Sequence, residues 1–286
     1  MQTRSSPVSR ELELDKVTPP GLVGLRRRLV ELDRVVVAFS GGADSAFLAK
    51  VATDELGADK VLCVTAVSPS LAPEELADVR ALVREWSLRH SEVETDELAN
   101  PAYAANDGSR CAHCKGALLD VVGPLAESEG AVVVLGVNTD DLGDHRPGQQ
   151  VASERGAVFP LVDSGFSKAE IRRASKELGL RTWDKPAAAC LASRVPYGTP
   201  VTAPTLRSVA LAESGLRALG FRELRVRHYG DLARIELPTH DLADAISRRE
   251  EIVAAVRSAG YLYVTLDLEG FRSGNLNAAL RREAQS

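Results

Sequence analysis

The chain has 286 residues, which is enough for one large domain or two modest ones. With 44% hydrophobic and 26% charged residues it has the composition of an ordinary globular protein, and its net charge of −5 provides no general attraction to nucleic acid. No apolar run reaches the roughly 18 residues that a membrane span needs, and residues 1–16 lack the apolar core of a secretory signal. We therefore expect a cytoplasmic protein with no membrane and no nucleic-acid partner.

Apolar runs of strand length alternate with helical patterns over residues 20–183, after an expected flexible arm at residues 1–19. Three continuous apolar runs, typical of central parallel strands covered on both faces, lie at 35–39, 61–67 and 131–137. One helical pattern begins behind Pro73, and another begins with a capping-box pair, Ser167 and Glu170. The alternation predicts a doubly wound, mostly parallel α/β sheet.

The chain changes character after residue 183. Residues 184–204 contain four prolines and little periodicity, which indicates a long functional loop or a connection between domains. Beyond it we expect a helix, two strands joined by a tight turn, a second helix and a third strand, at 205–219, 223–229, 232–237, 241–258 and 261–268. This order predicts a smaller α+β domain over residues 205–280, which we expect to serve substrate binding or assembly into a homo-oligomer.

The most informative segment is Ser-Gly-Gly-Ala-Asp-Ser at residues 40–45, which follows the first apolar strand directly and opens a helical pattern. Glycines let the backbone turn sharply, and the N–H groups of the turn and helix start form an anion cradle with the hydroxyls of Ser40 and Ser45. The absence of Gly-Lys-Ser/Thr from the sequence here excludes a Walker A loop. A turn with glycines needed only for packing is the alternative, but six matched positions in this context favour phosphate binding.

The motif SGGxDS resembles the PP-loop of ATP pyrophosphatases. That resemblance implies that the pyrophosphate end of ATP, with Mg²⁺, is held by Ser40, Gly41, Gly42, Asp44 and Ser45. A substrate oxygen would then attack the α-phosphorus, giving an adenylate and free pyrophosphate. Positioned backbone donors and a metal stabilise the charge on the leaving pyrophosphate without reorganising. Asp44 could orient the water shell of the metal, and capping the following helix is its alternative role.

A second turn, which contains Gly136, Asn138 and Asp141, follows the third apolar run. It lies at the carboxyl end of a predicted strand, and ligands in open α/β sheets bind at that edge. By itself such a turn is only a helix cap. Because this turn lies next to a PP-loop, contact with nucleotide or metal is as good an interpretation as a helix cap.

The four cysteines fall into two classes. Cys63 lies inside an apolar run, which predicts an inert, buried thiol. Cys111 and Cys114 form a C-x-x-C at the start of a helical pattern, where the helix N-terminus lowers thiol pKa values. Half a zinc site, a redox pair and half an iron–sulfur site all fit this spacing. Cys190 lies in the irregular 184–204 segment and is either buried there or held as a thiolate by nearby Lys185 and Arg194.

Three cysteines outside the core, with no fourth, suggest a cubane cluster in which one iron stays open to an exogenous ligand such as sulfide. A zinc site closed by His113 or another group is the alternative.

The whole pattern resembles LarE-type sulfurtransferases, over about residues 20–280. The resemblance is carried by long, collinear segments: the PP-loop, RCAHCK at 110–115, GVNTDDLGDHRPGQQVA at 136–152, WDKPAAACLASRVPYGTPVT at 183–202, VRHYGDLARIEL at 226–237 and YVTLDLEGFRSGNLN at 263–277. It implies ATP-dependent adenylation of the carboxylates of a pyridinium-3,5-dicarboxylate mononucleotide, followed by sulfur delivery to give thiocarboxylates, in biosynthesis of the nickel-pincer cofactor of lactate racemase.

The resemblance also implies roles for individual residues. In one branch of the family the cysteine matching Cys190 gives up its own sulfur and becomes dehydroalanine. In another, that cysteine and a C-x-x-C hold a [4Fe-4S] cluster that carries an extra sulfide. Cys111, Cys114 and Cys190 are all present, so the chain resembles the cluster branch. The anionic substrate would be bound by arginines, for which the candidates are Arg194, Arg225, Arg227 and Arg272.

Two other functions remain as alternatives. A tRNA-thiolating PP-loop enzyme also uses a C-x-x-C with a distant cysteine, but it predicts a basic face or an added RNA-binding module, and the net charge of −5 argues against it. A nucleotide-binding module without catalysis leaves the intact loop and the three cysteines unexplained. The sulfur donor is left open by the sequence.

Overall fold

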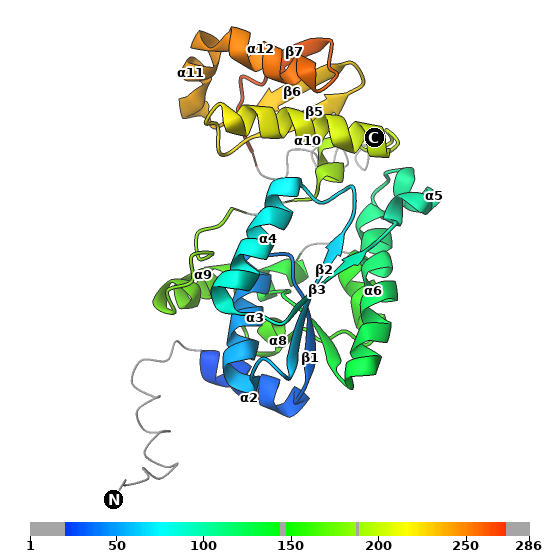
Figure 1. Ribbon diagram of the computed structural model, residues 1–286, viewed down its shortest axis with the longest axis vertical. Coiled ribbons are helices and arrows are strands. Elements are labelled where there is room, and N and C mark those ends of the chain that lie inside the picture. The colour runs from blue at the N-terminus through cyan, green and yellow to red at the C-terminus, as the bar shows by residue number, and fades with distance from the viewer. Residues whose placement is uncertain (1–20, 144–146, 187–188, 273–286) are drawn as a thin grey trace, which may run out of the picture.

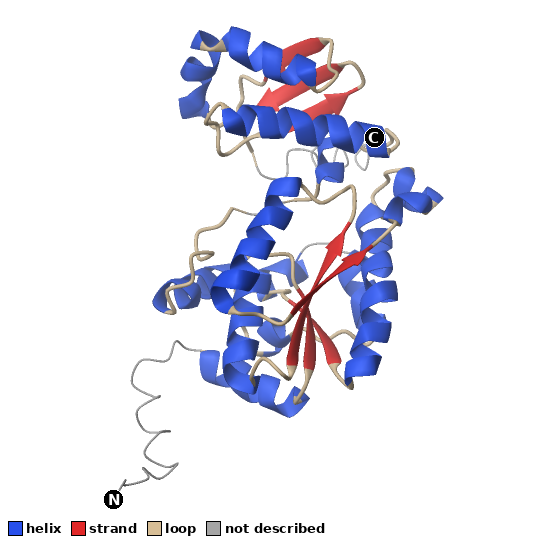
Figure 2. Cartoon of the chain, in the orientation of Figure 1, coloured by secondary structure: helices blue, strands red, loops and turns tan. Residues whose placement is uncertain are grey.

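The computed structural model describes residues 21–143, 147–186 and 189–272, so the expected arm at 1–19 lies outside the described residues. Within these residues the chain forms two sheets, a four-stranded parallel sheet and, after it along the chain, a three-stranded mixed sheet (Figures 1 and 2). No helix in the described residues is both long enough and apolar enough to cross a membrane.

Four parallel strands form the first sheet in the order β3-β2-β1-β4. They are β1 (Val35–Ala38), β2 (Val61–Val67), β3 (His90–Glu94) and β4 (Val132–Leu135). The parallel order confirms the predicted doubly wound α/β sheet, and three of the strands coincide with the apolar runs. The apolar pattern does not predict the edge strand β3, because its sequence His-Ser-Glu-Val-Glu has a single apolar residue and none of its residues is buried.

Helices cover both faces of the sheet (Figure 1). Val35 and Val37 point to the face that is covered by α2 (Leu22–Leu32), α3 (Ala43–Leu56), α4 (Pro73–Trp86) and α9 (Lys168–Glu177). Val36 points to the face that is covered by α6 (Arg110–Glu129) and α7 (Pro147–Glu154). The shorter elements are α5 (Pro101–Ala104), α8 (Pro160–Asp163) and the 3₁₀ turns η1 (Glu97–Ala99) and η2 (Thr139–Gly143).

Two predicted helix starts are confirmed. Pro73 occupies the first turn of α4, where its missing N–H has no intrahelical partner to lose. Both reciprocal bonds of the capping box between Ser167 and Glu170 form at the start of α9. These local signals fix where the helices begin, and therefore where their first turns lie relative to the strand ends.

The second sheet has the order β5-β6-β7, with β5 antiparallel to β6 and β6 parallel to β7. This unit contains α10 (Ala203–Ala218), β5 (Arg225–Tyr229), β6 (Leu232–Glu236), η4 (Thr239–Asp241), α11 (Leu242–Ser247), α12 (Arg249–Ser258) and β7 (Tyr263–Leu266). It has its own apolar core. The single helix expected over 241–258 is wrong, because the chain breaks at Arg248, whose guanidinium donates to the carbonyl of Leu219.

A short 3₁₀ turn, η3 (Leu191–Arg194), interrupts the irregular 184–204 segment. Its buried residues join one apolar cluster with Tyr103 from α5 and with Leu206 and Val209 from α10. The segment therefore packs against both sheet-containing parts of the chain. The boundaries 20–183, 184–204 and 205–280 remain our proposed division.

Gly136 directly follows β4, where the strand end meets the first turn of α3. A Cβ at this position would lie 2.8 Å from the backbone nitrogen of Ser45 and 2.9 Å from its Cα. Real Cβ atoms do not approach backbone atoms this closely, so glycine is required for α3 to sit against the strand end.

We expect Gly136→Ala to lower the free energy of unfolding by roughly 1–3 kcal/mol, because one of two backbones must shift. Gly24→Ala is the matched control, since a Cβ there meets only Ser164 at ordinary contact distances on the exposed side of α2. Urea unfolding measures both. Equal stability of the two variants would contradict the close approach.

Candidate functional site

A cavity of about 340 Å³ opens at the carboxyl ends of β1, β2 and β4. It is lined by residues of the three strand ends, of the loop at 40–45 and of α6, α9 and the 184–204 segment. This is the edge at which parallel α/β sheets bind ligands. The expected location of the site is therefore where the structure has its cavity.

Hydrogen bonds of the serine hydroxyls hold the loop between β1 and α3 in shape. The Oγ atoms of Ser40 and Ser45 lie 3.0 Å apart, the N–H of Gly42 donates to Ser40 Oγ at 3.4 Å, and Ser45 Oγ donates to the Gly42 carbonyl at 3.2 Å. Gly41 has a φ of +68°, and a Cβ there would lie 2.7 Å from Val79 Cγ2. The first N–H groups of α3 have no intrahelical acceptors, so the loop presents free donors to an anion.

Asp44 places a buried carboxylate at the start of α3. One oxygen accepts a hydrogen bond from Asn138 Nδ2 at 3.2 Å, and the other, Oδ1, is buried without a partner in the described structure. Burial raises the pKa of Asp44, nearby Asp141 adds to the rise, and Lys168 opposes it. No side chain caps α3, so the capping role is absent. An unpaired carboxylate oxygen in a phosphate cavity suits a hydrated Mg²⁺ ion.

The turn after β4 is held together by Asn138. Its Oδ1 accepts from the N–H groups of Asp140 and Asp141, and Asp141 Oδ2 accepts from the N–H of Asn138 at 3.3 Å. Asp140 in turn accepts from the N–H of Lys168 at 2.8 Å. Gly136 lines the cavity. Asn138 therefore orients Asp44, and Asp141 shapes the turn.

Four cations that the sequence motifs do not single out for nucleotide binding line the cavity: Lys115, Lys168, Arg172 and Lys185. Asp44 is the only acid among the described lining residues. Such an excess of positive charge matches a triphosphate. Their position in the sequence could have indicated two of them, since Lys168 and Arg172 lie one turn apart at the start of α9, where the capping box begins.

Lys185 connects three parts of the site. Its ammonium donates to the Gly41 carbonyl at 3.1 Å, to Asp78 at 2.6 Å and to Glu75 at 2.9 Å. Asp78 and Glu75 belong to α4, so the PP-loop, α4 and the start of the 184–204 segment are tied to one charge. Lys185 is therefore engaged with α4 and is not the thiolate partner that the sequence suggested for Cys190.

The four cysteines fall into the two predicted classes, one in the core and three outside it. Cys63 is buried, which raises the pKa of its thiol to about 12 and confirms an inert core residue. Cys111 and Cys114 lie in the first two turns of α6, and Cys111 and Cys190 are exposed. The expectation of a lowered pKa is wrong for Cys114, because burial, together with Cys190, Glu97 and Cys111, raises its pKa to about 12 despite Lys115.

Cys111, Cys114 and Cys190 meet in one region. Cys114 packs against the apolar cluster that contains Leu191 and Ala192, and the thiols of Cys190 and Cys111 both act electrostatically on Cys114. Within residues 21–143, 147–186 and 189–272, however, no three His, Cys, Asp or Glu side chains are arranged to hold a metal ion. The structure brings the thiols together without a preformed ligand set.

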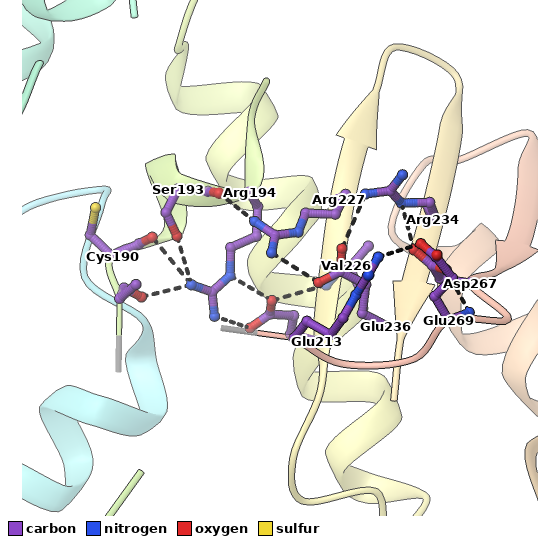
Figure 3. A network of polar contacts seen from close by, with 12 residues as sticks. Cys190, Ser193, Arg194, Glu213, Val226, Arg227, Arg234, Glu236, Asp267 and Glu269 are labelled. Atoms are coloured by element: carbon purple, nitrogen blue, oxygen red, sulfur yellow. Dashed lines mark hydrogen bonds and ion pairs between the residues drawn. The ribbon is translucent and has the colours of Figure 1, made fainter. Parts of the chain in front are cut away.

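The candidate arginines divide into two pairs (Figure 3). Arg194 and Arg227 are buried: Arg194 pairs with Glu213 at 2.8 Å, and Arg227 pairs with Glu236 at 2.9 Å and donates to the Ser193 carbonyl at 2.7 Å. Arg194 also donates to the carbonyls of Ala189 and Cys190, while the sulfur of Cys190 points away from it. These contacts give both arginines a structural task.

Arg225 and Arg272 are more available. The Arg225 guanidinium stacks over Phe271 at 4.7 Å, and burial together with the neighbouring Arg194 and Arg227 lowers its pKa. An anion would relieve this crowding of positive charge. Arg272 is exposed and pairs with Glu269. Their role in substrate binding remains a prediction.

Residues 26–112, which include the PP-loop, match the family model described as NAD synthase. An uncharacterized protein of Synechocystis is 48% identical, over 91% of this chain and 98% of the relative. The pyridinium-3,5-bisthiocarboxylic acid mononucleotide synthase of Lactiplantibacillus plantarum is 38% identical, over 89% of this chain and 92% of that enzyme.

The chain belongs to the LarE family. An uncharacterized protein of Methanocaldococcus jannaschii is also similar, at 27% identity over 88% of this chain and 97% of the relative. Membership confirms the LarE-type interpretation of the collinear motifs and favours it over a tRNA-thiolating enzyme or a non-catalytic module. The cavity at the PP-loop is accordingly the candidate ATP site of this LarE-family chain.

We expect Asp44→Asn and Asp44→Ala to slow release of pyrophosphate from ATP by at least about 10²-fold, because the cavity loses its charged metal partner. Asp54→Asn, on the exposed side of α3, is the control and should retain activity. Unchanged pyrophosphate release by the Asp44 variants would remove Asp44 from the site.

The same Asp44→Asn variant should melt at a higher temperature than the wild type at pH 7 without ATP. Because burial raises the pKa of Asp44 in the folded state, its protonated form favours folding, and this contribution is lost as pH rises through the folded pKa. The gain from Asn should therefore shrink as pH falls towards the ordinary pKa range of aspartate. A gain independent of pH would show that the carboxylate is not the cause.

Proposed function

We propose that this LarE-family chain uses ATP to adenylate the carboxylates of pyridinium-3,5-dicarboxylate mononucleotide and then replaces a carboxylate oxygen by sulfur, in nickel-pincer cofactor biosynthesis. The observation that carries the proposal is the juxtaposition of a cationic PP-loop cavity with three thiols: Lys115 lines the ATP cavity and directly follows Cys114. An enzyme that adenylates and then thiolates needs these two chemistries side by side, because the adenylate must be held until sulfur arrives.

The adenylation step is supported by the cavity. The N-terminus of α3, the loop hydroxyls and the cations of α9 face the place where a triphosphate would lie. Mg²⁺ would be held through Asp44, whose buried Oδ1 has no partner in the described structure, and would neutralise charge on the phosphates. Asn138 keeps that carboxylate in place. The pyrophosphate leaving group then departs into positive charge already present before the reaction.

Sulfur transfer is supported by the three thiols. Their donor set fits an iron–sulfur cluster with three protein ligands, and we propose that Cys111, Cys114 and Cys190 hold a [4Fe-4S] cluster. Such a cluster would supply an iron with an open position for sulfide. The chain's own contribution is to hold two segments together so that Cys190, in the 184–204 segment, faces the first turn of α6.

Substrate recognition is proposed for the second unit. Arg225, beside Arg194 and Arg227, lies at the start of β5, close to the segment that carries Cys190. A mononucleotide substrate carries a phosphate and two carboxylates, and guanidinium groups bind such anions in a bidentate manner. Arg272 would add a second, exposed contact. The proposed assembly into a homo-oligomer would bring further surface to this unit.

Replacing Cys111, Cys114 or Cys190 individually with Ala should remove iron from anaerobically purified protein and stop multiple turnover, because each would remove one of three ligands. Iron and sulfide analysis with an absorption spectrum measures the first effect. Cys63→Ala is the matched control and should keep iron. Loss of the elements of H₂S from Cys190 after one turnover of iron-replete protein, detected by mass spectrometry, would instead establish the sacrificial route.

Replacing Arg225 or Arg272 with Met should raise the KM for the pyridinium substrate by about 30-fold, the loss expected for a charge-assisted contact, without changing ATP binding. Arg222→Met is the control, because Arg222 is exposed and lies three residues before β5. Steady-state kinetics with pyrophosphate detection separates the two substrates. Unchanged KM values in both variants would place these arginines outside the substrate site.

A further inference from the structure

A buried amide at the corner between α5 and α6 makes several of the contacts that hold the 184–204 segment there. Asn106 is fully buried and has a φ of +58°. Its Nδ2 donates to the carbonyls of Val195 at 3.3 Å, Pro196 at 2.8 Å and Thr199 at 2.8 Å. The backbone carbonyl of Asn106 accepts from the N–H of Gly198 at 3.1 Å. These contacts join positions about 90 residues apart in the chain.

Arg110 extends the same connection towards the cysteines. It is 4% exposed, and its Nη1 donates to Asn106 Oδ1 and, at 2.9 Å, to the carbonyl of Ala192. The guanidinium also lies over the ring of Tyr197, 5.6 Å from its centroid. Among the described residues Arg110 makes no ion pair with a carboxylate. Its charge is therefore used to bind backbone and ring atoms of the 184–204 segment.

The contacts of Arg110 lie close in sequence to two of the cysteines. Arg110 directly precedes Cys111, and Ala192 lies two residues after Cys190. The Arg110–Ala192 bond thus joins the two thiol-bearing segments one residue from Cys111 and two residues from Cys190. Tyr197, against which Arg110 stacks, is within electrostatic range of both Cys111 and Cys190. A buried bond to a charged donor is costly to break, because its partners are left without water.

We propose that Asn106 and Arg110 are positioning residues that set the spacing between Cys190 and the C-x-x-C pair. The proposal rests on the proposed function only in assigning that spacing to sulfur transfer. Neither residue lines the ATP cavity. The clamp formed by Asn106 and Arg110 therefore serves the sulfur half of the reaction and leaves the adenylation half to the PP-loop.

Thiol spacing can be measured without ATP, substrate or iron. Iron-free protein is treated with dibromobimane, which joins two thiols only when they are a few ångströms apart, and peptide mass spectrometry then identifies bridges that include Cys190. The variants are Arg110→Met, which keeps the apolar stem, and Asn106→Gly, which suits the positive φ and removes only the amide. Arg89→Met, which breaks an exposed ion pair with Glu129, is the control.

Wild type and Arg89→Met should form the Cys190 bridge to Cys111 or Cys114. In Arg110→Met and Asn106→Gly the yield should fall about tenfold, the effect of losing one hydrogen bond to a charged or buried group. Sulfur transfer should fall similarly, while pyrophosphate release stays within about twofold of wild type because the ATP cavity is untouched. Arg110→Lys, which reaches fewer acceptors, should give an intermediate bridge yield.

Equal bridge yields in wild type and Arg110→Met would overturn the clamp, and so would a wild type that forms no bridge to Cys190. The clamp would also be overturned if both Asn106→Gly and Arg110→Met lost pyrophosphate release, because that result would show a general loss of structure. Failure of the proposed function would give a different result. The wild type would make no thiocarboxylate, but the yield of its Cys190 bridge would still fall in Arg110→Met.

Discussion

Glu213 is the residue on which the attachment of the 184–204 segment to the second sheet depends. Its fully buried carboxylate accepts from Arg194 at 2.8 and 3.1 Å, from Arg217 at 2.9 Å and from the backbone N–H of Val226 at 3.1 Å. Burial alone would raise the pKa of Glu213, but the two arginines and the backbone donor outweigh it and keep the carboxylate charged. Removing one partner of such a pair leaves an uncompensated buried charge, which is strongly destabilising. One carboxylate therefore holds η3, α10 and β5 together.

Two charged residues anchor the 184–204 segment. Lys185 ties the beginning of the 184–204 segment to the PP-loop, and Arg194 ties the middle of it to α10 through Glu213. Cys190 lies between these two anchors and stays exposed, with its carbonyl bound and its sulfur turned away from Arg194. The backbone is held while the thiol is left free, which is the arrangement a transferring or ligating sulfur needs.

Much of this organisation is visible in local sequence. The apolar runs predict β1, β2 and β4 because central parallel strands are buried on both faces, whereas β3 escapes detection because an edge strand needs no such run. Capping signals place α4 and α9, since the first turn of a helix must satisfy its own N–H groups. The single helix expected over 241–258 fails because a distant carbonyl, that of Leu219, holds Arg248 where the helix breaks.

The sequence by itself determined the strand–loop–helix of the PP-loop and the family, because each is a pattern within one segment or a set of collinear segments. Only the tertiary structure decided which cations face the cavity, that Asn138 orients Asp44, and that Arg194 and Arg227 are held in buried ion pairs. It also decided the pKa of Cys114, where burial outweighs the helix N-terminus. The physical reason is that burial and charge pairing depend on residues brought together from distant parts of the chain, which no local pattern records.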